Sequence, residues 1–200
     1  LLRRSFYDRD VLTVAREVLG MRLVRLIDGR RVSGIITEAE AYRHQEDLAC
    51  HAHAGMTKRN SVMFGPPAHA YGYFTYGMHW MLNLVCEAEG LPAAVLIRAI
   101  RPVEGLEVMR MLRPTLADKP GWLNGPAKLT QALAIGREQN GVDVCSEDEG
   151  LWVEKGISVP AEEVETTPRI GIGYAPEPWL SLLWRWVWKA GNVSYPMLQR

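Results

Sequence analysis

Hydrophobic residues recur at helical spacing in three parts of the chain. The first stretch follows Asp8 and Asp10, either of which can cap a helix, and it stops at Gly20. The third begins with Pro126, which suits the first turn of a helix because the N–H that proline lacks has no partner there. The pattern predicts helices over residues 11–19, 105–113 and 127–135.

Between these stretches hydrophobic positions alternate with a period of two, which is typical of strands. Asp28-Gly29 is a tight-turn dipeptide between two such runs and therefore predicts a hairpin. Gly77-Met78 separates two further runs in a stretch that is rich in aromatic residues. The other strands are expected over residues 21–27, 32–42, 93–101, 151–154, 169–173 and 182–188.

The composition is that of a globular domain. With 200 residues, of which 48% are hydrophobic and 23% charged, the chain can bury a core without disulfides or metals. It has no repeat, low-complexity segment or dividing linker, and no apolar run of the roughly 18 residues that would span a membrane. We therefore expect a single domain over residues 1–200 with a mixed α/β (α+β) fold around a largely antiparallel sheet.

Cysteine and histidine give little sign of metal chemistry. Cys50, Cys86 and Cys145 are odd in number and form no Cys-x-x-Cys pair, which favours reduced thiols. His51 and His53 lack an obvious third ligand, and the chain contains no phosphate-binding glycine motif. We expect no metal, no cofactor and no membrane, in a protein of the cytoplasm (bacterial nucleoid), or of the nucleus if it is eukaryotic.

Charge is balanced overall but unevenly distributed. Residues 48–86 contain no acidic residue, four of the five histidines and the pair Lys58-Arg59, whereas residues 138–165 contain nine acidic residues and one lysine. A polyanion would be tolerated by the first segment and repelled by the second. A neutral core segment and a solvated acidic loop would give the same distribution, so this alternative stays open.

Two carboxylates and a tyrosine are candidates for chemistry. Glu38, Glu40 and Tyr42 share one face of their predicted strand, by its period of two. Paired acids beside an apolar wall are a common way to set up a general base. The same spacing also fits an exposed edge strand with solvated glutamates.

An aromatic cluster follows within ten residues, and it contains Tyr71, Tyr73, Phe74, Tyr76 and Trp80. Tyr71 and Tyr73 share a strand face, where aromatic residues most often belong to a core. Tyr76 is different because it stands beside a glycine at the predicted hairpin tip. Exposed side chains at such tips can wedge between bases and unstack them.

Nine short strings occur along the chain in this order: Ile36–Tyr42, His51, Arg59-Asn60, Tyr71–Met78, Asn83, Leu96–Ala99, Glu104–Arg110, Gly125–Leu129 and Arg169–Gly173. Together they resemble the alkyladenine (3-methyladenine) DNA glycosylase family, of the type that is not built from helix-hairpin-helix modules. The resemblance covers about residues 3–195. It implies a curved sheet with surrounding helices and a protruding β-hairpin.

The resemblance also implies a reaction. Glu40 would be the general base that deprotonates a water molecule, and Arg98 and the backbone carbonyl of Ile170 would help to hold that water. Breaking an N-glycosidic bond builds positive charge on the sugar, which a nearby carboxylate stabilises. No lysine stands at a matched catalytic position, so the enzyme would be monofunctional, acting as a monomer on double-stranded DNA that contains a damaged purine.

The remaining matched residues would bind the substrate. Tyr42, His51 and Tyr73 would sandwich the flipped base, with His51 at a hydrogen-bonded edge, and Asn83 would line the pocket floor. Tyr76 would enter the duplex and fill the gap. The residues expected to contact the DNA backbone are Arg59, Met78 and Lys128.

Two other functions fit parts of the pattern. The chain could be a non-catalytic nucleic-acid-binding domain on the same fold, with the aromatic residues as a stacking platform. It could also be a hydrolase of free nucleosides. Glu40 together with Arg98 favours an enzyme over a binding domain, and Tyr76 favours duplex DNA over a nucleoside, which needs no wedge.

Overall fold

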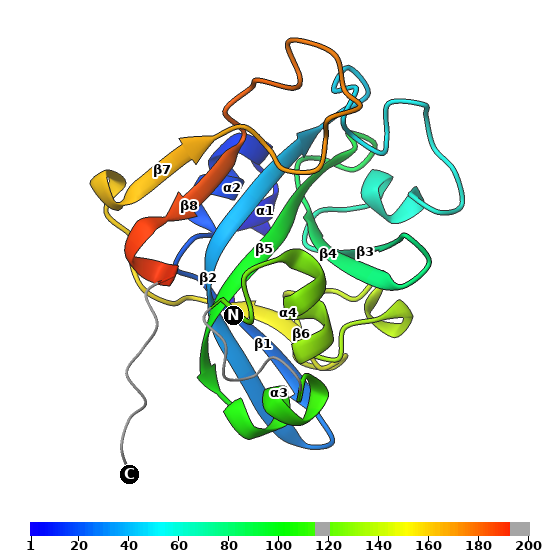
Figure 1. The fold of residues 1–200 in the computed structure, drawn as a ribbon. Helices are drawn as coiled ribbons and strands as arrows, with labels where there is room; N and C mark the ends of the chain where they lie inside the picture. The colour runs from blue at the N-terminus through cyan, green and yellow to red at the C-terminus, as the bar shows by residue number, and fades with distance from the viewer. Residues whose placement is uncertain (115–120, 193–200) are drawn as a thin grey trace.

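The computed structural model describes residues 1–114 and 121–192, which form a curled eight-stranded antiparallel sheet with short helices around it (Figure 1). The sheet order is β3-β4-β5-β2-β1-β6, and β8 pairs with β2 and β7 with β8. The strands are β1 Arg22–Ile27, β2 Arg30–Arg43, β3 Ala70–Thr75, β4 His79–Val85, β5 Ala93–Glu104, β6 Leu151–Glu154, β7 Val164–Thr167 and β8 Arg185–Trp188. The mixed α/β fold with a curved antiparallel sheet, predicted from the sequence, is confirmed.

Short helices join and cover these strands. The α-helices are α1 Arg4–Tyr7, α2 Val11–Glu17, α3 Leu106–Leu112 and α4 Pro126–Ala132, and the 3-10 helices are Ser61–Phe64, Arg137–Gln139, Ala161–Glu163 and Lys189–Asn192. The three predicted helices are confirmed with shorter ends. In α2, Asp10 is the cap, because its carboxylate accepts the N–H groups of Leu12 and Thr13 at 3.1 Å.

The long strand β2 lies at the centre of the sheet. It pairs with β5 along most of its length, and on its other side with β1 first and then with β8 at Glu38–Glu40. Its register against β5 shifts on both sides of Glu38. Flanking strands cover this segment on both edges, so Glu38 and Glu40 do not lie on the exposed edge strand that the sequence left open.

The two faces of the sheet differ in character. Alternate residues such as Ala39, Ala41, Val95 and Ile97 are buried in the main core together with α2. Burying each large side chain there contributes about 1.5–3 kcal/mol. The intervening residues of the same strands, Glu40 and Leu96 among them, face the other way. This second face carries the candidate site.

The hairpin β3–β4 projects from the sheet (Figure 1). Its turn places Tyr76 at φ 52° and Gly77 at φ 68°, and the Met78 N–H donates to the Thr75 carbonyl at 3.2 Å. Two left-handed residues in succession are the geometry of a type I′ turn, which matches the twist of the paired strands. The predicted hairpin with Tyr76 at its tip is confirmed.

One strand prediction was wrong. Residues 169–173 are irregular, because Pro168 and Gly171, at φ 81°, interrupt the extended backbone and the Arg169 side chain turns inward. The strand predicted over residues 182–188 is confirmed with a later start at Arg185, since a turn precedes it. The expected domain (1–200) and family extent (3–195) reach into residues 193–200, which lie outside the described residues.

Candidate active site

A cavity of about 440 Å³ opens on the second face of the sheet. Five tyrosines and His51 line it, with Arg98 as its charged side chain and no acidic residue among the described residues of the lining. The size lies in the range of about 300–1,000 Å³ that is typical of ligand pockets. The lining includes Tyr42, His51, Tyr71, Tyr73, Tyr76, Asn83, Leu96, Arg98, Ile170 and Tyr174.

Strand register brings the main groups into one row. Tyr71 lies opposite Asn83, Asn83 opposite Leu96, and Leu96 opposite Glu40. Residues directly opposite one another on antiparallel strands put their side chains on the same face. Side chains that are far apart in the sequence therefore meet at one place, from β3 across β4 and β5 to β2.

The carboxylate of Glu40 lies just behind the cavity wall. Glu40 is fully buried, and three lining residues contact it. The Ile170 N–H donates to Oε1 at 2.7 Å, the Tyr42 hydroxyl donates to Oε2 at 2.9 Å, and Nη1 of Arg98 lies 3.3 Å from Oε1. A water molecule that reached this point from the cavity would therefore meet a carboxylate oriented by fixed donors.

Opposing influences act on the protonation of Glu40. Burial raises the pKa of its carboxyl group, and Glu38 adds to that rise. Arg98, the Ile170 N–H and the Tyr42 hydroxyl lower the pKa, but burial prevails. A carboxylate that holds its proton more readily than usual is a stronger base when it is ionised, as general-base chemistry near neutral pH requires.

Glu38 occupies a different environment. Its Oε1 accepts from Nε of Arg98 at 2.6 Å and from Nε of Arg185 at 2.7 Å. Glu38 does not line the cavity. The one carboxylate oxygen accepts from two guanidinium groups and so holds both arginines in place. The geometry makes Glu38 an anchor for Arg98 and Arg185.

His51 and Tyr73 form a stacked pair. Their ring centroids are 3.6 Å apart with an interplanar angle of 20°, so no base fits between them. The Tyr71 hydroxyl lies 3.2 Å from Nδ1 of His51 and fixes its orientation. His51 and Tyr73 would therefore have to lie on the same side of any planar ligand, and Tyr42 lines the cavity separately from this pair.

His51 is neutral in this setting. Although it is exposed within the cavity, desolvation by the surrounding walls lowers its pKa to about 4, and the positive charge of Arg59 acts in the same direction. An imidazolium would repel a cationic ring stacked beside it. The neutral imidazole avoids this repulsion and keeps one acceptor and one donor nitrogen.

Asn83 makes a hydrogen bond within the hairpin and also lines the cavity. Its Nδ2 donates to the Tyr71 carbonyl across the hairpin at 3.1 Å, which is the local backbone role that asparagine often has. Asn83 is nearly buried and lines the cavity, so its side chain also limits the space at the floor.

The hairpin tip is the most exposed aromatic part of the site. Tyr76 is 83% exposed and Met78 67% exposed, although Tyr76 also borders the cavity. The guanidinium of Arg59 lies 4.2 Å from the Tyr73 ring centroid and donates to the Phe74 carbonyl. Arg59 therefore lies beside the turn end of the hairpin, close to the tip.

Lys128 lies in α4, whose first residue, Pro126, lines the cavity. The Lys128 side chain is exposed, with its ammonium 3.4 Å from the Gly121 carbonyl. The helix begins beside β5, since the Gly125 N–H donates to the Arg98 carbonyl at 2.8 Å. The two basic candidates, Arg59 and Lys128, thus come from different elements, and each lies near residues that line the cavity.

Three contributors were missed by the sequence analysis. Tyr174 lines the cavity, is 69% exposed and donates its hydroxyl to the Ala49 carbonyl at 3.1 Å. Asp47 and Arg169 form a fully buried ion pair behind Tyr42. Arg169 begins a string that the family resemblance included, but neither periodicity nor spacing pairs it with an aspartate 122 residues away.

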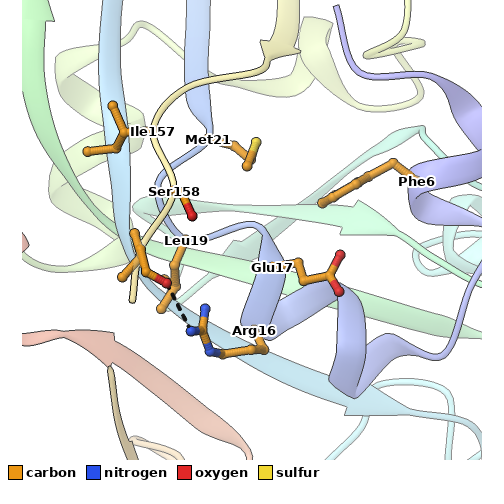
Figure 2. A pocket seen from close by; sticks show the side chains of 8 residues that line it. Phe6, Arg16, Glu17, Leu19, Met21, Ile157 and Ser158 are labelled. Carbon is orange, nitrogen blue, oxygen red and sulfur yellow. Dashed lines mark hydrogen bonds between the residues drawn. The ribbon is translucent and has the colours of Figure 1, made fainter. Parts of the chain in front are cut away.

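A second hollow of similar volume lies between α1, α2 and residues 157–159 (Figure 2). Its arginine, Arg16, donates to the Val159 carbonyl at 3.1 Å. Its carboxylate, Glu17, pairs with Arg9. Both charges are already engaged, and none of the predicted site residues lines this hollow.

The structure shows neither a metal-binding cluster nor a membrane-spanning helix within the described residues. Within residues 1–114 and 121–192, no three side chains of histidine, cysteine, aspartate or glutamate come together as metal ligands would. In the same ranges, none of the helices has the length and apolar character that crossing a bilayer requires. Cys50, Cys86 and Cys145 are unpaired thiols.

Comparison with known proteins identifies the family. The model of the methylpurine-DNA glycosylase (MPG) family matches residues 5–192. The chain belongs to the methylpurine-DNA glycosylase family. A protein of Methanocella arvoryzae named "Putative 3-methyladenine DNA glycosylase" is 51% identical, over 90% of each chain. Proteins with the same name from Carboxydothermus hydrogenoformans (52%, over 86% of this chain and 88% of that one) and Burkholderia lata (44%, over 100% and 94%) are also similar. The resemblance and enzyme class predicted from the sequence are confirmed.

Proposed function

We propose that this methylpurine-DNA glycosylase family member is a monofunctional DNA glycosylase that acts on alkylated or deaminated purines. It would turn the damaged base out of duplex DNA and hydrolyse its bond to deoxyribose with a water activated by Glu40, which would initiate base excision repair. The observation that carries the proposal is the fully buried Glu40 carboxylate, held by three hydrogen-bonding or charged groups directly behind an aromatic cavity.

The cavity suits a purine with delocalised positive charge. Tyr42 would stack on one face of the base, and the His51–Tyr73 pair on the other. Attraction between a cation and aromatic faces is worth about 0.5–2 kcal/mol, which favours an alkylated purine over a normal one. The neutral state of His51 avoids opposing that attraction. Flipping is easiest for a poorly paired base, which adds to the selectivity.

The proposed step keeps every atom accounted for. Water adds its oxygen to C1′ of the sugar, Glu40 takes the proton, and the electrons of the C1′–N bond leave with the purine. A cationic purine becomes neutral on departure, so it needs no general acid, whereas a neutral deaminated purine would leave as an anion and take up a proton from solvent water. Glu40 is enclosed by Tyr42, Arg98 and Ile170, so water would enter between these three residues.

Residues that contact Glu40 would assist it in this reaction. Arg98 would orient the water and balance the charge of the carboxylate. Ile170 contacts Glu40 through its N–H, and holding the water with its carbonyl remains part of the proposal. Among the described residues that line the cavity there is no lysine, which supports hydrolysis by water over a Schiff-base mechanism that would also cut the strand.

DNA would be engaged at the rim. Tyr76, which is exposed on a tight turn beside the cavity, would occupy the stack that a flipped base leaves. Arg59, Lys128 and the backbone near Met78 would contact phosphates, with the protein acting as a monomer. The cavity lining has no acidic residue among those described, so a polyanion meets no repulsion there.

An excision assay tests the proposal. A duplex with one hypoxanthine, ethenoadenine or methylated purine is incubated with the protein, and the free base and alkali-labile sites are measured. The expected result is base release with an intact strand before alkali. Binding without release would indicate a non-catalytic domain, and release only from free nucleosides would indicate a nucleoside hydrolase. Strand cleavage before alkali would contradict the monofunctional mechanism.

A further inference from the structure

A fully buried ion pair joins the loop after β2 to the loop after β7, which lie beside each other in Figure 1. Nη1 of Arg169 lies 2.6 Å from Oδ2 of Asp47, and Nη2 lies 2.9 Å from Oδ1. The carboxylate of Asp47 also accepts the N–H groups of Arg43 and Ala49. A two-pronged contact of this kind fixes direction as well as distance, so it sets the position of both loops.

Arg169 also touches the strand that carries Glu40. Its Nη1 donates to the Ala41 carbonyl at 3.0 Å, and its guanidinium carbon lies 4.7 Å from the Tyr42 ring centroid. The next residue, Ile170, donates its N–H to Glu40. Both neutral donors on the Glu40 carboxylate are thus connected to Arg169, one by ring contact and the other by a single peptide bond.

We propose that Asp47 and Arg169 are positioning residues that hold the Ile170 N–H and the Tyr42 hydroxyl against the Glu40 carboxylate. Neither residue lines the cavity, so neither would touch the substrate. The inference rests on the proposed function, because it assigns to the pair the preparation of the general base. Asp47 and Arg169 would affect the reaction only by holding Ile170 and Tyr42 in position.

The pair should influence the protonation of Glu40. Hydrogen bonds from Ile170 and Tyr42 favour the ionised carboxylate and oppose the rise in its pKa caused by burial. If the pair is loosened, these bonds lengthen and the pKa of Glu40 rises further. The titratable and charged groups around Glu40 are Glu38 and Tyr42 on β2, Arg98 on β5, Arg185 on β8 and Arg169 in the loop.

The first test is Arg169→Lys, which keeps the positive charge and removes the two-pronged contact. Single-turnover release of a positively charged methylated purine is measured against pH. We expect release at neutral pH to fall about tenfold, the acidic limb of the profile to move to higher pH, and lesion-DNA binding to stay within about threefold. A wild-type rate and limb in the folded variant would overturn the inference.

Arg31→Lys is the matched control. Arg31 also makes a two-pronged contact with a carboxylate, that of Glu154, and its guanidinium lies 5.6 Å from the Trp152 ring centroid, but it does not line the cavity. The variant therefore measures the general consequence of removing such a contact. Its rate and pH profile should equal those of the wild type, and the same change as in Arg169→Lys would overturn the inference.

Asp47→Asn is an independent test, because the direction in which the pKa of Glu40 shifts distinguishes the two possible effects. This variant also replaces Arg169→Lys as the test if Arg169→Lys fails to fold. Removing a nearby negative charge would by itself lower the pKa of Glu40, whereas losing the positioning would raise it. An upward shift of the acidic limb supports the inference, and an unchanged or downward shift overturns it. Glu40→Gln is measured alongside. Normal release by that variant contradicts the proposed function, whereas loss of release there with an unchanged Arg169→Lys contradicts only this inference.

Discussion

The region around Glu40, called the floor of the site below, and the tip of the β3–β4 hairpin differ most in how far their side chains are exposed to solvent. At the floor, Glu40 is completely buried and its charge is balanced by contacts from three elements. At the tip, Tyr76 is 83% exposed on a two-residue turn. Burial in the sheet raises the pKa of the Glu40 carboxyl group, whereas the exposed ring of Tyr76 would be available to DNA. Changes at the floor should alter chemistry and stability, and changes at the tip should alter binding alone.

The largest expected effect is at the floor. Glu40→Gln keeps the size of the side chain and removes the base, so we expect base release to fall by at least about a thousandfold. Binding to lesion DNA should remain within a few fold, because Glu40 does not line the cavity. Single-turnover excision and binding are measured on one duplex. Near-normal excision would show that another carboxylate acts, with Glu38 the next candidate.

The second-largest expected effect is on the free energy of unfolding, which should fall for a change at the floor and stay nearly constant for a change at the tip. Glu38→Ala leaves Arg98 and Arg185 without the carboxylate that both contact, and losing one partner of a buried ion network lowers the free energy of unfolding by about 3–5 kcal/mol. Denaturant unfolding measures this change. Tyr76→Ala, the comparison variant, should stay within about 0.5 kcal/mol of the wild type. Equal destabilisation of both variants would contradict the division between floor and tip.

Binding to lesion-containing DNA should depend on the tip more than on the floor. Without its aromatic wedge, Tyr76→Ala should bind lesion-containing duplex about ten- to a hundredfold more weakly, which corresponds to the worth of one stacked ring. Binding to a single strand that carries the same lesion should change little, because no stack has to be filled. Fluorescence anisotropy on both substrates makes the comparison. Similar losses on both would mean that Tyr76 serves the cavity and not the duplex.

Asn83 gives the smallest expected effect. Guanine differs from hypoxanthine by one exocyclic amino group, and stacking on tyrosines barely distinguishes the two rings. The Asn83 side chain narrows the cavity floor, so Asn83→Ala should raise guanine release several-fold relative to hypoxanthine release by removing a steric conflict. The ratio is measured on mismatched duplexes. An unchanged ratio in a folded variant would leave Asn83 with only its bond to the Tyr71 carbonyl.

Much of the site framework follows from the sequence pattern. The period of two along β2 put Glu40 and Tyr42 on one face, and in the structure their side chains are hydrogen-bonded. The glycine beside Tyr76 predicted the turn that exposes it. These features depend on local spacing, since neighbouring residues determine strand alternation and turn type. Local patterns were therefore sufficient for them.

Other features depend on contacts that no local pattern records. Burial of Glu40 comes from β5 and β8 on the two sides of β2, so the sequence left an exposed edge strand open. The stretch from Arg169 to residue 173 alternates like a strand, but the bond of Arg169 to Asp47 turns it into an irregular loop. Tyr174 gave no signal because its place on the cavity depends on that loop.

The pH dependence of single-turnover release tests the central claim most directly. A positively charged methylated purine needs no proton to leave. The rate should therefore fall on the acidic side of the pH profile only because the general base, Glu40, becomes protonated. Burial raises the pKa of Glu40, and the ionised form is required. The limb should therefore have its midpoint above about 4.5, the usual value for glutamate, and it should vanish in the residual activity of Glu40→Gln. A limb near 4 would point to His51 instead, and a flat profile would contradict a buried carboxylate as the base.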